Sequence, residues 1–368
     1  MIWLIFLPAI GYQCLAIFAA VRHLRRHRSA RPNSDSTFKP AVSVLKPVYG
    51  LDRNTYGAFV SQIQQDYPEF EVLFGARDEH DPAIAEVRRL VRDFPEAPVR
   101  LIIGAAPARN GKVGVLTELA RHARHPVWVV NDSDIKVTRS YLAEIVSTLD
   151  GDAGLVTCLY RPSAHNVPAA WEALGISADF MPSILVAQLV GVREFGLGST
   201  LAFRADDLER AGGFAAVADY LADDYQLAKR ISELGKTVVL SAYTVETSIN
   251  VSTWGGVWNH QLRWARTVRV TKASGHVGLP VAHAGLWAVI AVVTGAWLPA
   301  FVLIAARITS ALVAGWLVLR CRVALALCWL SPVWDLYAFA LWVTSYASRE
   351  VRWRDRTLKI DKEGRIRL

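Results

Sequence analysis

The sequence predicts an α/β domain with a mostly parallel sheet, flanked by helices that cross a membrane. From Pro40 onward, short apolar segments alternate with amphipathic ones, which is typical of strands that alternate with helices. Long apolar segments lie near both ends of the chain. The apolar run 128–130 leads directly into Asn131, Asp132, Ser133 and Asp134, which predicts a buried strand with carboxylates at its carboxyl end. Open α/β sheets bind their ligands at that end of their strands.

The composition favours a water-exposed domain attached to a membrane. Of the 368 residues, 52% are hydrophobic and 20% are charged, so the chain is too apolar for an ordinary soluble enzyme and too charged for membrane helices alone. The net charge of +8 comes from basic residues beside apolar segments, which favours an anionic membrane surface as the partner over nucleic acid. No CxxC or zinc spacing occurs among the four cysteines, which argues against a metal or disulfide framework.

The N-terminal segment sets the expected orientation in the membrane. Residues 1–21 form an apolar run about long enough to span a bilayer, and 22–39 form a basic linker. Positive charge after the run and none before it places the following domain in the cytosol. A cleaved signal peptide would carry its charge in front of the apolar run. We therefore expect a multi-pass protein of the inner, cytoplasmic membrane with a cytosolic domain over residues 40–278.

The acidic tip at residues 131–134 is the first candidate site. Two aspartates spaced as Asp132 and Asp134 can hold a hard divalent cation, which usually shares its coordination with substrate phosphates. An ordinary Asx turn after a strand is the alternative interpretation of the same residues. The predicted strands are 42–45, 71–75, 99–103, a strand that ends at Asp132, 154–158 and a strand entered from the glycine-rich turn 196–198.

Two further segments carry candidate functional residues. Asp223 and Asp224 begin an amphipathic helix, where acidic residues also suit the helix dipole. The helix predicted over 257–270 carries His260, Arg263, Trp264 and other basic residues, and a cationic helix lying on lipid is its alternative interpretation.

The C-terminal part becomes apolar again over residues 279–348. One span is predicted over 281–306 and another over 323–347, while the apolar segment 308–319 is short. Asp335 lies inside the last span and is expected to face neighbouring helices, with a functional polar residue as the alternative interpretation. The basic tail 349–368 favours the cytosol and therefore an even number of C-terminal crossings, with two expected and four possible.

Five motifs in order resemble the ceramide glucosyltransferase family and its bacterial relatives, which include hopanoid-linked glycosyltransferases. The resemblance extends from Val42 to Arg269 and implies a membrane-bound, inverting enzyme with a GT-A fold. The motifs are Lys46-Pro47-Val48-Tyr49-Gly50, Phe74-Gly75-Ala76-Arg77-Asp78 with Asp81-Pro82-Ala83, Asp132-Ser133-Asp134-Ile135, Ala222-Asp223-Asp224-Tyr225 and Arg263-Trp264.

The resemblance implies a role for each acidic motif. Asp78 would contact the nucleotide, Asp132 would belong to the metal and diphosphate site with Asp134, and Asp224 would be the catalytic base. Position 223 is often Glu in the family and is Asp in this chain.

The other motif residues are implied to bind the sugar nucleotide or the acceptor. Arg263 and Trp264 would close on the diphosphate and the acceptor, and Pro47 and Tyr49 belong to a nucleotide-binding motif. Lys112 lies where the family has an Asn-Pro-Lys pattern. His260 occupies a position that is Gln or Arg in the family.

The residues and the resemblance together predict transfer of one hexose from a UDP-sugar to a membrane lipid. UDP-glucose or UDP-N-acetylglucosamine is the expected sugar nucleotide, ceramide or a hopanoid polyol the acceptor, and Mg²⁺ or Mn²⁺ the cofactor. A divalent ion and Arg can neutralise a leaving diphosphate, and a carboxylate can accept the acceptor's proton. A processive polysaccharide synthase would share these signals but needs more membrane helices, and a non-enzymatic scaffold would not explain the acidic strand ends.

Overall fold

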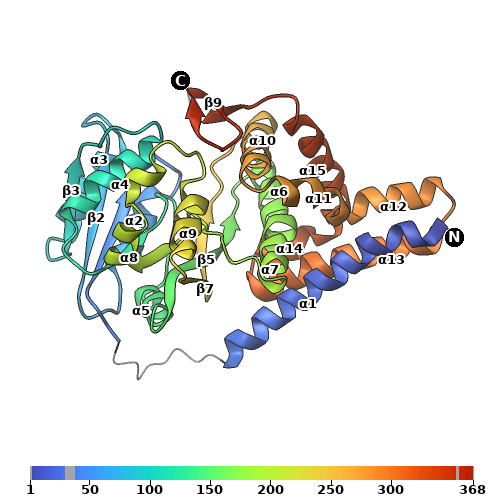
Figure 1. Ribbon diagram of the computed structural model, residues 1–368, viewed down its shortest axis with the longest axis horizontal. Coiled ribbons are helices and arrows are strands. Elements are labelled where there is room, and N and C mark those ends of the chain that lie inside the picture. The colour runs from blue at the N-terminus through green and yellow to red at the C-terminus, as the bar shows by residue number, and fades with distance from the viewer. Residues whose placement is uncertain (1, 30–37, 354–355, 368) are drawn as a thin grey trace. The chain divides into compact units, whose positions relative to one another are not determined.

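The computed structural model describes residues 2–29, 38–353 and 356–367, which form two compact units (Figure 1). The sheet unit comprises Ala30–Tyr160 and Arg193–Ser248. The membrane unit comprises Met1–Ser29, Arg161–Val192 and Ile249–Leu368. The sequence predicted one continuous domain over residues 40–278, whereas residues 161–192 and 249–278 group with the terminal helices in the structure.

The sheet unit is built on a seven-stranded sheet of order β3-β2-β1-β4-β6-β5-β7. The strands β3, β2, β1 and β4 run parallel, and β6 is antiparallel to both β4 and β5. The prediction of an α/β fold with a mostly parallel sheet is therefore confirmed. The strands are β1 (Val42–Pro47), β2 (Phe70–Ala76), β3 (Val99–Ile103), β4 (Val127–Val130), β5 (Ala153–Ser163), β6 (Leu201–Arg204) and β7 (Thr237–Ser248).

Two hydrophobic cores cover the two faces of this sheet. In β4, Val127 and Val129 point into one core, while Trp128 and Val130 point into the other. Because both faces are covered, the central strand β4 is continuously apolar instead of alternating. The first core is shared with α2 (Thr55–Ile63), α3 (Ala83–Asp93) and α5 (Tyr141–Ser147), and the second with α4 (Gly111–His122), α8 (Ala205–Arg210), the 3₁₀ turn η3 (Phe214–Val217) and α9 (Asp223–Glu233).

The membrane unit is helical and ends in a small antiparallel sheet. This sheet has the order β10-β9-β8, so the predicted basic tail is folded over its described residues. Its elements are η1 (Ile2–Phe6), α1 (Leu7–Ser29), α6 (Val167–Gly175), the π-helix η2 (Ile176–Phe180), α7 (Met181–Leu189), α10 (Trp254–Thr271), α11 (Ala273–Ala282), α12 (Ala284–Val293), α13 (Trp297–Leu312), η4 (Val313–Val318), α14 (Arg322–Leu327), η5 (Cys328–Leu330), α15 (Ser331–Ser345), β8 (Glu350–Trp353), β9 (Arg356–Ile360) and β10 (Ile366–Arg367).

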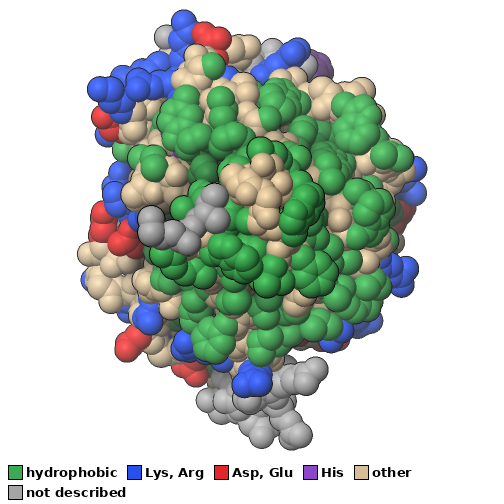
Figure 2. All heavy atoms as spheres, turned by 90° about the vertical axis from the view of Figure 1, so that its right-hand side faces the viewer, with side chains coloured by type: hydrophobic (Ala, Val, Ile, Leu, Met, Phe, Trp, Pro, Cys, Tyr) green, Lys and Arg blue, Asp and Glu red, His purple; other side chains and the backbone are tan. Residues whose placement is uncertain are grey.

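Three helical segments among the described residues are long and apolar enough to cross a membrane: Trp3–Arg26, Trp297–Val318 and Arg322–Ser345. The pair α11 and α12 passes the same test but bends by 49°, which would make a fourth. Large apolar side chains gather on the exterior in Figure 2, and several exposed ones come from these helices, including Leu4, Trp297 and Phe301. Such a surface is typical of contact with lipid.

One predicted span is wrong in its boundaries. The sequence predicted a single helix over 281–306, but α12 ends at Val293 and α13 begins at Trp297. Gly295 lies between them with φ 75°, a left-handed conformation that ends a helix. The helical segment that begins at Trp297 continues to Val318 and so includes most of the short apolar segment 308–319. Two C-terminal spans are therefore found among the described residues when the bent pair is not counted.

A buried ion pair links the helices of the membrane unit. Asp335 in α15 is fully buried and accepts hydrogen bonds from the Arg307 guanidinium in α13: Nε lies 2.9 Å from both carboxylate oxygens, and Nη2 lies 2.7 Å from Oδ1. The backbone N–H of Gly285 donates to Asp335 at 2.8 Å, and Arg307 Nη1 donates to the carbonyl of Ala178. The pair therefore connects α12, α13, α15 and η2.

We expect Arg307→Met to destabilise the membrane unit by about 3–5 kcal/mol, because it leaves the Asp335 carboxylate buried without its counter-charge. The double variant Arg307→Met/Asp335→Leu should recover most of that loss. Thermal unfolding of the protein in lipid nanodiscs measures both. The exposed Arg322 provides the control Arg322→Met, which should lie close to wild type. Equal stability of Arg307→Met and this control would contradict the role given to the pair.

Candidate active site

Lys46 supports the polar tip of β4 from the neighbouring strand. Its side chain is fully buried, and its ammonium donates to Asn131 Oδ1 and to the carbonyl of Asp132, both at 2.8 Å. Burial lowers the pKa of Lys46 to about 7, against the opposing effect of the nearby carboxylates, of which Asp134 is the strongest. Lys46 therefore fixes the backbone from which both tip aspartates extend.

Asp132 and Asp134 differ in their surroundings although they share one turn. Asp132 Oδ1 lies 2.7 Å from the Lys112 ammonium, and the Asp132 side chain is 43% exposed. Asp134 accepts a hydrogen bond from the Thr247 hydroxyl in β7. Burial, and then the charge of Asp132, raises the pKa of Asp134 to about 6. Together with Asp223 and Asp224, these carboxylates outnumber the two lysines of the site, Lys46 and Lys112.

Lys112 connects this tip to the start of α9. It lies in the first turn of α4, where Asn110 caps the helix by accepting from the backbone N–H of Lys112 at 3.1 Å. Its ammonium is 3.2 Å from Asp223 Oδ2, and Asn110 Nδ2 donates to Asp223 Oδ1 at 3.3 Å. Burial alone would lower the pKa of Lys112, but the carboxylates of Asp132, Asp223 and Asp224 raise it above its usual range. Lys112 is therefore a fixed cation between the two acidic motifs.

Asp224 is held at the N-terminus of α9 by two backbone amides. Its Oδ2 accepts from the N–H of Gly198 at 2.9 Å, and its Oδ1 accepts from the N–H of Tyr225 at 2.7 Å. Burial, and then the charge of Asp223, raises the pKa of Asp224 to about 6. Each carboxylate oxygen has a second lone pair, so Asp224 can still accept a proton.

The glycine-rich turn before β6 lies between the two acidic motifs. A Cβ at Gly198 would be 2.8 Å from Asp132 Oδ2, and one at Gly196 would be 2.7 Å from the carbonyl of Asp224. The N–H of Asp132 also donates to the carbonyl of Gly198 at 3.1 Å. Only glycine allows this close approach, which the sequence pattern alone did not explain.

The first two predicted motifs meet in a pair of connected loops. Gly50, at φ 69°, donates its N–H to Asp81 Oδ1 at 2.9 Å, and Asp81 also accepts from the N–H of Ala83. This bond joins the loop after β1, which carries the exposed Tyr49, to the loop after β2. Pro47 is the last residue of β1. In the latter loop the exposed Asp78 accepts from the N–H of His80.

The remaining predicted site residues lie on α10 in the membrane unit. His260 Nδ1 hydrogen-bonds the buried carboxylate of Glu172, and its ring lies 5.1 Å from that of Trp264. Trp264 also packs on Phe180, with ring centroids 5.1 Å apart. Residues 260, 263 and 264 are spaced by three and four positions, so they share one face of α10.

Two other basic residues of α10 have structural partners. Arg266 donates to the carbonyl of Glu350, and Arg269 donates to the carbonyl of Ser348 at 2.9 Å. The guanidinium of Arg269 also lies over the Tyr346 ring. These contacts hold the C-terminal segment, so the basic character of α10 is not explained by lipid binding alone.

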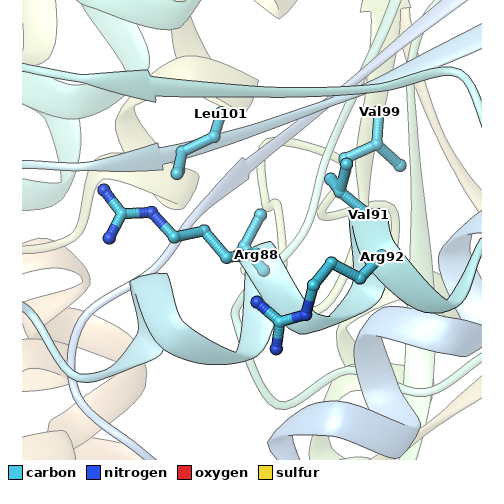
Figure 3. Close-up of a pocket in the computed structure, with 6 residues that line it drawn as sticks. Arg88, Val91, Arg92, Val99 and Leu101 are labelled. Atoms are coloured by element: carbon cyan, nitrogen blue, oxygen red, sulfur yellow. The ribbon is translucent and has the colours of Figure 1, made fainter. Parts of the chain in front are cut away.

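The pocket drawn in Figure 3 belongs to neither acidic motif. It lies between α3 and the edge strand β3 and is lined by Val87, Arg88, Val91, Arg92, Val99 and Leu101. Two strands, β2 and β1, separate β3 from β4 in the sheet. Its lining offers no carboxylate for catalysis.

The carboxylates fit a divalent ion only as part of a shared site. No group of three potential ligands among His, Cys, Asp and Glu occurs in the described part of the chain. Asp132 and Asp134 nevertheless supply hard oxygen ligands, and their excess negative charge would be relieved by a cation. Magnesium-like ions commonly take one or two carboxylates and complete their coordination with phosphates and water. The residues present therefore fit such an ion.

The model of glycosyl transferase family 21 matches residues 1–366 of this sequence. The chain belongs to this family. The glycosyltransferase is 27% identical over 257 residues to ceramide glucosyltransferase 1 of Caenorhabditis elegans, covering 68% of this chain and 54% of that protein. It is 24% identical over 234 residues to ceramide glucosyltransferase 3 of the same organism, covering 62% of this chain and 50% of that protein. The chain thus matches about half the length of these curated relatives.

A solved structure supports the fold of this glycosyltransferase. The mannosyltransferase PcManGT from Pyrobaculum calidifontis, in complex with GDP-Man and Mn²⁺, superposes with a TM-score of 0.55 at 21% identity. The alignment covers 93% of this chain and 97% of the mannosyltransferase. The predicted GT-A fold is therefore confirmed.

We expect Gly198→Ala to reduce glycosyl transfer by about 100-fold, the scale of a 1 Å misplacement in an active site. The added methyl group would displace the Asp132 carboxylate, from which its Cβ would be only 2.8 Å away. Steady-state turnover of the sugar nucleotide measures the loss. Gly278→Ala is the control, because a Cβ there meets no atom within 4 Å. Wild-type turnover in Gly198→Ala would show that the close approach is not required.

Proposed function

We propose that this glycosyltransferase moves one hexose from a UDP-sugar to the hydroxyl group of a membrane lipid, with inversion at the sugar carbon. The observation that carries the proposal is the linkage of Asp132, Asp223 and Asp224 through Lys112 and Gly198 at the carboxyl end of β4. The three long apolar helices found among the described residues supply a reason for a lipid acceptor. The curated relatives named ceramide glucosyltransferases favour glucose and ceramide, with N-acetylglucosamine and a hopanoid polyol as the other candidates.

The roles of the sheet unit follow from charge and position. Asp132 and Asp134 would hold Mg²⁺ or Mn²⁺, which when bound neutralises charge that develops on the leaving diphosphate. Lys112 places a second positive charge beside Asp132. Three residues are proposed to contact the nucleotide: Pro47 at the end of β1, Tyr49 on the loop after it, and Asp78 on the loop after β2.

Asp224 is the proposed general base. Its raised pKa of about 6 leaves it ionised at neutral pH while making it a stronger proton acceptor than an ordinary aspartate. Asp223, the rival carboxylate, is 6% exposed and already pairs with Lys112 and Asn110. One base and one displacement are sufficient for inversion and need no covalent intermediate.

The membrane unit is proposed to bind the diphosphate and the acceptor. Arg263 presents a planar guanidinium that can bind phosphate oxygens in pairs, and Trp264 presents an aromatic face fixed between His260 and Phe180. His260 occupies the family's first motif position and is proposed as a further diphosphate contact.

We also propose a location in the inner membrane with the sheet unit in the cytosol. The basic residues that follow the first span support it. Protease added outside sealed cells should spare residues 40–270, and cleavage within them would reverse this topology.

Purified protein given radiolabelled UDP-sugars and a lipid extract should form a lipid carrying one sugar. UDP-glucose with ceramide is the first pair to test, because the relatives' names point to it. A second set of reactions tests UDP-N-acetylglucosamine as the sugar nucleotide and hopanoid polyols as acceptors. A polymeric product would indicate a polysaccharide synthase, and no transfer to any lipid would reject the proposal.

We expect Asp224→Asn to lower lipid glycosylation by about a hundredfold or more, the usual scale for loss of a general base. Affinity for the UDP-sugar should change little, because the amide keeps the shape of the carboxylate. Single-turnover transfer and equilibrium binding of UDP measure the two quantities. The matched control is Asp223→Asn, which removes the neighbouring charge.

If Asp223→Asn abolishes transfer while Asp224→Asn retains it, the base has been assigned to the wrong carboxylate. If Asp224→Asn instead loses UDP binding, this residue belongs to the nucleotide site.

A further inference from the structure

The groove between α3 and β3 combines apolar side chains with two arginines (Figure 3). It has a volume of about 460 Å³. Its apolar lining comes from Val87 and Val91 of α3 and from Val99 and Leu101 of β3. Val91 is 42% exposed, so part of this apolar surface is open to solvent. None of the roles above uses the groove.

Arg88 and Arg92, which also line the groove, have no hydrogen bond or ion pair within the described residues. The arginine between them is different, because Arg89 lies 3.5 Å from Glu86 and 3.6 Å from Asp93. Both Arg88 and Arg92 are exposed. Since residues four positions apart share one face of a helix, α3 presents two uncompensated positive charges beside the groove.

The strand on the other side of the groove, β3, is an edge strand with a free row of backbone groups. At its two ends, the carbonyl of Pro98 and the N–H of Gly104 both bond to β2. Alternate residues of a strand direct their backbone groups to the same side, so those of Leu101 and Ile103 point away from β2. Because β3 is the last strand of the sheet, they have no neighbouring strand among the described residues.

The opposite edge of the same sheet is partly covered. Glu246 of β7 exchanges two backbone hydrogen bonds with Lys136, at 2.9 and 3.0 Å. Proteins commonly cover an edge strand or interrupt it with proline, because a free edge pairs readily with another chain. The sequence of β3, Val-Arg-Leu-Ile-Ile, contains no proline. Its free edge is therefore suited to pairing.

The arginines and the strand edge together favour an extended acidic segment as the ligand. A strand added beside β3 places alternate side chains on the face that Val99 and Leu101 occupy, where the groove lies. Side chains two residues apart on a strand are separated by about 6.6 Å, and residues four apart on a helix by about 6 Å. Two acidic side chains at alternate positions would therefore match Arg88 and Arg92. A lipid headgroup would bind the arginines but leave the backbone of β3 unpaired.

We propose that β3 and the adjoining groove form a docking site for an extended acidic segment of a partner protein. The segment pairs with the outward backbone groups of Leu101 and Ile103 and places two carboxylates on Arg88 and Arg92. The backbone bonds provide affinity for any extended chain, and the arginines select an acidic one. This interaction is separate from glycosyl transfer, because no residue proposed for catalysis lines the groove.

A fluorescein-labelled short peptide of alternating threonine and aspartate is the probe for this site. It is added to the full chain in nanodiscs of zwitterionic lipid, which offer no competing anionic headgroups. We expect saturable binding by fluorescence anisotropy and slower hydrogen exchange at the amides of Leu101 and Ile103. The same peptide with asparagine in place of aspartate should bind about tenfold more weakly, because it loses both charge-assisted contacts.

Two variants separate the charges from the strand edge. Arg88→Gln/Arg92→Gln should weaken binding of the aspartate peptide about tenfold. Leu101→Pro removes an outward N–H, which edge strands tolerate, and should weaken binding by a similar factor. Arg89→Gln is the matched control, because it removes the same charge from the same helix outside the groove, and it should bind like the wild type. Thermal unfolding checks each fold, and the arginine variants test the proposal even if Leu101→Pro folds poorly.

Four results would overturn the proposal. The first is no saturable binding of the aspartate peptide, and the second is equal binding by Arg88→Gln/Arg92→Gln and Arg89→Gln. The third is binding without slower exchange at Leu101 and Ile103, which would indicate an anion site that a lipid headgroup can also fill. The fourth is self-association of the full chain that Leu101→Pro abolishes and the peptide does not displace, which would assign the edge to a second copy of this chain.

Discussion

The ammonium group of Lys112, between Asp132 and Asp223, is the interaction on which the site depends. It joins the start of α4, the end of β4 and the start of α9, which are far apart in the sequence. Without this positive charge the carboxylates would repel one another more strongly; burial first, and then a neighbouring carboxylate, already raises the pKa of both Asp134 and Asp224. Gly198 then allows Asp132 and Asp224 to share one turn of backbone. The acidic residues are held close together because the fold supplies fixed cations and amides, and this arrangement suits the binding of a further cation with a diphosphate.

The two units compensate their buried charges in different ways. In the sheet unit, several carboxylates share Lys46 and Lys112 and retain an excess of negative charge. In the membrane unit, Arg307 pairs with Asp335, and His260 hydrogen-bonds the buried Glu172. The first pair is fully hydrogen-bonded and links helices, which is the expected use of a charge in apolar surroundings. In the second contact, one carboxylate oxygen of Glu172 has no hydrogen-bond partner among the described residues.

Much of the fold could be predicted because it depends on local patterns. The apolar run before Asp132 predicted a buried strand, and continuous apolar runs at both ends predicted membrane helices. The break at Gly295 was missed because hydropathy does not register backbone conformation, and the two-unit division was missed because it groups segments distant in sequence. Lys112 was predicted as a site residue from its position in a motif, but its link to Asp223 depends on tertiary contacts. Glu172 has no motif at all, and only the proximity of α6 to α10 reveals its partner.

The central claim is that the carboxylates at the end of β4 bind a divalent ion together with the diphosphate. Electron paramagnetic resonance of Mn²⁺ with the purified protein and UDP tests it most directly. The account predicts that UDP strengthens Mn²⁺ binding, that phosphorus couples to the bound ion, and that Asp132→Asn weakens this binding by at least the roughly tenfold to hundredfold loss seen when a metal site loses a supporting group. Mn²⁺ affinity and phosphorus coupling that are unchanged in Asp132→Asn would contradict it.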